Sequence, residues 1–73
     1  MIELYKKAAL TRDVPSDGLK RGDVGTVVMI HEGGGYEIEF MTFSGDTIAV
    51  VTLEAADLRP LRKREIANAR AVA

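Results

Sequence analysis

The stretch that decides the fold is Gly18-Leu19-Lys20-Arg21-Gly22-Asp23-Val24-Gly25-Thr26-Val27-Val28-Met29-Ile30. Its three glycines fall within eight positions and allow backbone conformations that other residues resist. The run Thr-Val-Val that follows them favours an extended, half-buried backbone, because β-branched side chains pack well on a pleated sheet. The stretch therefore predicts a tight turn that leads into a strand over about residues 25–32.

The segments on either side continue the pattern of short strands and turns. Residues 36–42 alternate clearly: Tyr36, Ile38 and Phe40 fall on one face, and Glu37 and Glu39 on the other. Glycines precede this strand and a Ser-Gly-Asp turn follows it. The remaining expected elements are strands over 4–11, 47–53 and 58–60 and a helical turn over 54–57.

This order of elements predicts an all-β fold, a small five-stranded SH3-like barrel. In that architecture the second to fourth strands form a meander, and a helical turn precedes the fifth strand. We assign residues 1–60 to the barrel, with Val14 and Leu19 in its long first loop turned inward to cover one end of the core. Residues 61–73 are rich in Ala, Arg and Lys and predict a short C-terminal tail that is helical or frayed.

Composition limits the class of protein. A chain of 73 residues forms one small domain, and the absence of cysteine excludes disulfides and thiolate metal sites. Residues 1–59 carry six bases against ten acids, a net charge of −4, whereas residues 60–73 carry four bases and one acid, a net charge of +3. No signal-peptide pattern or membrane-spanning apolar run is present, so we expect a cytoplasmic protein without a membrane partner.

Four motifs resemble a family of small bacterial proteins classified as a domain of unknown function. The motifs are ALT-x-D-x-P at residues 9–15, GL-x-x-GDVGTVV at 18–28, YE-x-EF at 36–40 and VTLEA-x-x-LRP at 51–60. The resemblance covers about residues 4–60 and implies a fold but little about function. Residues 19–32 also resemble, more weakly, the KOW segment of ribosomal proteins and transcription factors.

No group of residues forms a recognisable catalytic centre. His31 is the only histidine, and it lies at an expected strand end, where a partly exposed position suits it. Ser16 and Ser44 both lie in expected turns, where a hydroxyl caps local backbone groups. We therefore expect no enzymatic activity, no catalytic residues, no cofactor, no metal and no small-molecule substrate.

An excess of apolar residues favours a protein-interaction or accessory module of unknown pathway. If Tyr36, Ile38 and Phe40 point inward, Met41 and Phe43 have few obvious buried places. The fourth strand is apolar on both faces as well, and a small barrel cannot cover every one of these side chains. The expected protein interface is a patch around Met41, Phe43, Ala49 and Val51. Its occupant is expected to be another protein or a second copy of this chain.

Two alternative functions stay open. The first is a KOW-like nucleic-acid-binding barrel, whose expected contacts are the basic residues Lys20, Arg21, Arg62, Lys63 and Arg64. The acidic body argues against this alternative, because it has the wrong sign for nucleic acid. The second is a small antitoxin or immunity-type protein that covers a basic toxin with the acidic face formed by Glu37 and Glu39.

Overall fold

The computed structural model describes residues 2–72 and consists of five strands and two short 3₁₀ helices. The strands are β1 (Lys7–Leu10), β2 (Val24–Ile30), β3 (Tyr36–Met41), β4 (Thr47–Leu53) and β5 (Leu58–Pro60). The helices are η1 (Pro15–Asp17), in the loop between β1 and β2, and η2 (Ala55–Asp57), immediately before β5. The all-β prediction with five strands is confirmed, and the structure has the expected turn before the last strand.

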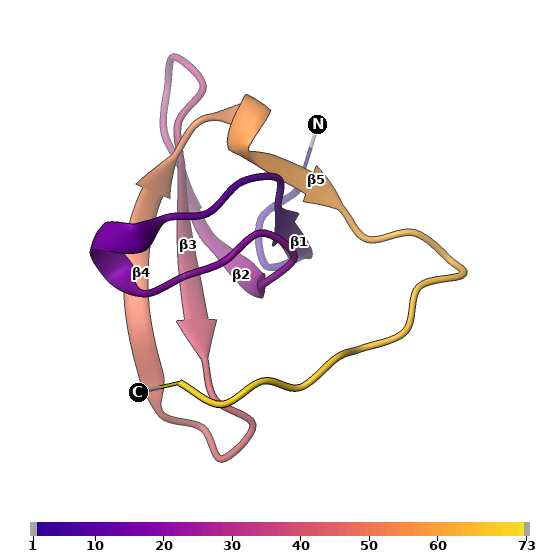
Figure 1. The fold of residues 1–73 in the computed structure, drawn as a ribbon. Helices are drawn as coiled ribbons and strands as arrows, with labels where there is room; N and C mark the ends of the chain where they lie inside the picture. Colours follow the sequence, from indigo (N-terminus) through magenta and orange to yellow (C-terminus); the bar gives the residue numbers. More distant parts are fainter. Residues whose placement is uncertain (1, 73) are drawn as a thin grey trace.

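All five strands belong to one open antiparallel sheet, in the order β4-β3-β2-β1-β5 (Figure 1). β2, β3 and β4 form the expected meander, and β1 lies between β2 and β5. β4 and β5 are therefore the two edges of the sheet. The register of β3 against β4 pairs Tyr36 with Leu53 and Ile38 with Val51, so the apolar face of β3 lies beside the apolar face of β4.

The buried hydrophobic residues of the described chain form one core. Every strand contributes to it, including Leu10 from β1, Val27 from β2, Ile38 from β3, Leu53 from β4 and Leu58 from β5. The alternation in β3 is confirmed, because Tyr36, Ile38 and Phe40 are buried and the two intervening glutamates are half-buried on the other face.

The long first loop closes one end of this core, as predicted. Val14 and Leu19 are buried and form an isolated bridge with each other. Gly18, with φ of 69°, allows the chain to reverse after η1. The backbone N–H of Lys20 donates to the Asp23 carboxylate at 2.8 Å, which holds the turn that leads into β2.

Strand β1 is shorter than the expected 4–11. Tyr5 has φ of 64°, and the N–H of Lys6 donates to the carbonyl of Glu3 at 3.2 Å, so residues 3–6 form a turn. The strand consequently begins at Lys7. The side-chain pattern alone does not reveal this turn, because a tyrosine with positive φ is uncommon.

The expected C-terminal helix is not present in the described part of the tail, residues 61–72. These residues leave β5, bend outward and return toward the hairpin between β3 and β4 as an extended strap (Figure 1). Ile66 is 94% exposed, so the tail has no apolar face packed on the body that would stabilise a helix. Its side chains bind the body instead, through the ion pairs described below.

Candidate functional site

The hairpin between β3 and β4 presents the most exposed aromatic side chain of the described residues. The N–H of Thr42 donates to the carbonyl of Asp46 at 2.8 Å, and Gly45 has φ of 99°, which closes the turn. Phe43 lies at the tip of this turn and is 89% exposed. Met41, at the end of β3, is 49% exposed. The turn thus holds a phenylalanine in solvent, where it contributes nothing to the core.

The four residues of the predicted interface do not lie on one surface in the structure. Met41 and Phe43 are exposed, whereas Ala49 and Val51 pack against the hydrophobic core on the inner face of β4. The exposed apolar side chain of β4 nearest the hairpin is Ile48. Its exposure follows from the alternation of the strand, because Ala49, Val51 and Leu53 face the core and Ile48 and Val50 therefore face outward.

A groove of about 1010 Å³ lies between the tail and the body of the protein. We call it the tail groove. Its body side comprises the turn before β2, the first residues of β2 and the β3–β4 hairpin, and its outer side is the tail from Leu61 to Val72. Its exposed or half-exposed large apolar side chains are Val24, Met41, Phe43, Ile48, Leu61, Ile66 and Val72.

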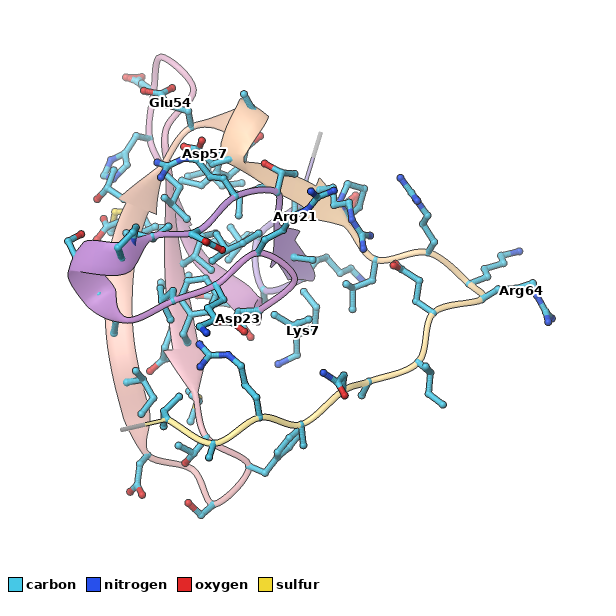
Figure 2. All side chains as sticks on the ribbon, in the orientation of Figure 1. Lys7, Arg21, Asp23, Glu54, Asp57 and Arg64 are labelled. Carbon is cyan, nitrogen blue, oxygen red and sulfur yellow. The ribbon has the colours of Figure 1, made fainter. Side chains whose placement is uncertain are left out.

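Basic side chains share this groove with the apolar ones. Three of the five basic residues predicted as nucleic-acid contacts, Lys20, Arg21 and Arg62, line it. Lys63 and Arg64 do not line it, and Arg64 lies at the outer bend of the tail (Figure 2). Lys7 also lines the groove, and sequence analysis missed it because only the fold brings β1 beside the tail.

The four basic residues Lys7, Lys20, Arg21 and Arg62 have no carboxylate partner within residues 2–72. Lys7 donates to the hydroxyl of Thr26 at 2.8 Å, a neutral acceptor that leaves its charge uncompensated. Figure 2 shows Lys7 and Arg21 beside the space that the tail encloses. The groove therefore combines apolar surface with an excess of positive charge, because these four cations outnumber the one carboxylate in its lining without an ion-pair partner, that of Glu39.

Two ion pairs attach the tail. Arg70 donates to both oxygens of the Asp23 carboxylate, at 2.8 and 2.5 Å, and also to the carbonyl of Gly18 at 3.1 Å. The Arg70 guanidinium lowers the pKa of Asp23. Closer to β5, Arg59 forms a bidentate pair with Glu65, and these hydrogen bonds, with one from the N–H of Arg62, lower the pKa of Glu65 to about 2. The position of the tail, which forms the outer side of the groove, thus depends on the carboxylates of Asp23 and Glu65.

The acidic residues of β3 lie on the outer face of the sheet. Glu39 accepts a hydrogen bond from the hydroxyl of Thr47 at 2.8 Å. Glu37 lies 3.0 Å from Nε2 of His31, whose side chain is 41% exposed. Both glutamates therefore already have a partner in this chain.

Residues 2–72 give little support for a metal site, a serine nucleophile or a membrane-spanning helix. No group of three His, Asp or Glu side chains there is placed to hold a metal ion. Ser16 lies in η1 and Ser44 in the β3–β4 turn, where its hydroxyl is 2.9 Å from that of Thr42. No helix among these residues has the length and hydropathy to cross a bilayer.

Comparison with known proteins places this sheet and its loops in a sequence family. The family described as Domain of unknown function (DUF4926) matches residues 4–60, the segment that runs from the turn before β1 to the end of β5. The chain belongs to the DUF4926 family. This confirms the resemblance drawn from the four motifs, and the matched segment ends before the tail. No curated protein and no solved structure matches the chain.

Proposed function

We propose that this protein is a non-catalytic interaction module that binds an extended segment of a partner protein in the tail groove. The partner segment carries apolar residues together with aspartate or glutamate. The apolar residues contact Phe43 and Met41, and the carboxylates meet the uncompensated cations of the groove. The scaffold of the module is an SH3-like barrel.

The strand order supports the SH3-like barrel. β1 pairs with both β2 and β5, β2 to β4 form a meander, and a 3₁₀ helix connects β4 to β5. The first loop is the longest connection between strands and folds over the core through Val14 and Leu19. This combination is the one that the sequence pattern predicts for such a barrel.

The observation that carries the proposal is the exposure of Phe43 in a groove that is also lined by unpaired cations. An aromatic residue that is 89% exposed gives no stability to the free protein, whereas aromatic residues in a groove are frequent anchors of protein interfaces. The cations of the same groove attract carboxylates and select against basic segments. The net charge of the whole chain, −1, does not reveal this local excess of positive charge.

A display library of short random peptides, screened against the full chain, tests the proposal. We expect enrichment of peptides that combine carboxylates with leucine or aromatic residues. The best peptide, labelled with a fluorophore, is then titrated by anisotropy against the protein and its variants. Phe43→Ser and Arg21→Glu should each weaken binding by about tenfold or more, because each removes a contact in the groove.

Lys63→Glu is the matched control for Arg21→Glu. It makes the same change of charge on a tail residue that does not line the groove, and it should change affinity by less than about threefold. Equal losses for Arg21→Glu and Lys63→Glu would show that net charge alone governs binding. Peptides that bind Phe43→Ser as well as the unchanged protein would overturn the proposal.

Single-stranded nucleic acid is a second candidate occupant of the same groove. The structure brings Lys20, Arg21 and Arg62 together with an exposed aromatic ring, and bases stack on such rings while phosphates meet the cations. A labelled oligouridine is the probe. Binding that weakens steeply with salt and is lost in Phe43→Ser would favour nucleic acid over a protein segment.

A further inference from the structure

The two edges of the sheet are protected to different degrees. β5 is three residues long, carries Arg59 and ends at Pro60, all of which discourage a further strand. β4 is seven residues long, Thr47–Leu53, and contains neither a charged residue nor a proline. An edge strand of this kind is a template for another strand.

The free side of β4 offers backbone groups for such pairing. Among the secondary-structure elements, β4 packs closely only against β3. Within residues 2–72, no backbone hydrogen bond joins residues 47–53 to any segment other than β3. In a strand with one neighbour, about half of the N–H and C=O groups point away from that neighbour. β4 therefore presents a row of unpaired donors and acceptors.

The side chains beside this edge are also suited to contact. Val50 is 52% exposed and Ile48 is 39% exposed, although both are β-branched apolar residues in the middle of a strand. Val50 pairs with Glu39 of β3, which places it on the outer face of the sheet, away from the core. These apolar side chains gain burial only when something covers the edge.

We propose that β4 pairs with β4 of a second copy of this chain, antiparallel and around a two-fold axis at Ala49. This register places Ile48 of each copy opposite Val50 of the other. The contact between these two exposed apolar side chains therefore occurs twice, once on each side of the axis. It places Asp46 opposite Thr52, and Glu54 opposite Ser44, of the second copy. The acidic residues at the strand ends therefore do not face one another.

A second copy fits this edge better than a charged segment. The seven residues of β4 include no charge, so two identical edges approach without repulsion, and the shared register is self-complementary. The tail groove lies outside this contact along most of its length, and Ile48 is the one residue of β4 that lines the groove. The paired sheet has ten strands, and its outer edges are the two protected β5 strands.

Sedimentation equilibrium of the full chain, over about 10 µM to 1 mM, tests the pairing, because an interface this small is expected to be weak. We expect a monomer–dimer equilibrium. Val50→Lys should weaken the dimer by about tenfold or more, because it introduces charge at the edge on both copies. Circular dichroism establishes that the variant keeps its fold.

Met29→Lys is the matched control. Met29 is 49% exposed and pairs with Glu37 on the same outer face, but it lies in β2, inside the sheet. This variant should dimerise as the unchanged protein does. A chain that stays monomeric up to 1 mM, or a dimer that Val50→Lys leaves intact, would overturn the proposal.

Disulfide trapping tests the register independently, since the natural chain has no cysteine. Ala49→Cys meets its own copy at the two-fold axis and should form a covalent dimer on mild oxidation. Thr52→Cys is exposed on the same strand, but its copy lies far along the paired strand, so it should stay monomeric under the same conditions. Crosslinking at residue 52 in place of residue 49 would contradict the proposed pairing.

Discussion

Gly25 lies against Ile38 so closely that no other residue fits at its position. A Cβ atom on Gly25 would lie 2.5 Å from Cγ2 of Ile38 and 2.9 Å from the carbonyl oxygen of Glu39. Both Gly25 and Ile38 are buried, and Ile38 is fully so. The glycine thus allows β2 and β3 to pack with the Ile38 side chain over the backbone of the neighbouring strand.

We expect Gly25→Ala to destabilise the protein by about 1–3 kcal/mol, because the added methyl group overpacks the core and the carbonyl of Glu39 cannot yield as a side chain can. Urea denaturation followed by circular dichroism measures the free energy of unfolding. Gly35→Ala is the control: its Cβ would lie no closer than 3.7 Å to any neighbour, and its effect should stay within about 1 kcal/mol. Equal stability of the two variants would contradict this account.

The two phenylalanines provide a direct comparison of structural and binding roles. Phe40 is 3% exposed and belongs to the core, whereas Phe43 is 89% exposed. Phe40→Ala should cost about 3–5 kcal/mol of stability, and the milder Phe40→Leu serves if the first variant does not fold. Phe43→Ser should change the free energy of unfolding by less than about 0.5 kcal/mol, measured in the same urea titration. A large loss of stability in Phe43→Ser would show that the hairpin tip packs on the body.

The position of the tail should depend on Arg70. Arg70→Ala removes every side-chain hydrogen bond to Asp23 and to the carbonyl of Gly18 that the tail makes here. We expect backbone heteronuclear NOE values for residues 66–72 to fall to those of a flexible chain end, while those of the strands stay unchanged. Arg64→Ala, at the outer bend of the tail, is the control, and it should leave the NOE values of both the tail and the strands unchanged. An Arg70→Ala tail as rigid as before would mean that other contacts hold it.

Acid should release the attachment between Arg59 and Glu65. The pKa of Glu65 is lowered from 4.5 to about 2 by its hydrogen bonds, so folding is favoured by the ionised carboxylate above pH 4.5. That contribution is lost as the pH falls through about 2. An NMR titration of the Glu65 carboxyl should give a midpoint near 2, and Arg59→Leu should return it toward 4.5. A midpoint near 4.5 in the unchanged protein would show that the pair does not form in solution.

Much of the sheet follows from local sequence pattern. The alternation of Tyr36, Ile38 and Phe40 identifies both the strand and its buried face, and the apolar run of β4 marks a strand with the bounds observed. Strand β1 begins at Lys7, later than the predicted start at residue 4. Its start depends on the backbone conformation of Tyr5, which the alternation of side chains does not reveal. Intrinsic propensity predicts a tail that is helical or frayed, whereas in the structure Glu65 and Arg70 bind partners on the body and the tail is extended.

The sequence by itself determined the class of fold, the number of strands and the inward face of β3, because hydrophobic alternation and turn chemistry are local. It also placed Met41 and Phe43 in the candidate interface. Only the tertiary structure decided that Ala49 and Val51 face the core and that Ile48 does not, because β4 is apolar on both faces and its pairing with β3 sets which face is inward. Only the fold, likewise, brings Lys7 and Arg62 to one groove, since charges distant in the chain become neighbours through strand order and the path of the tail.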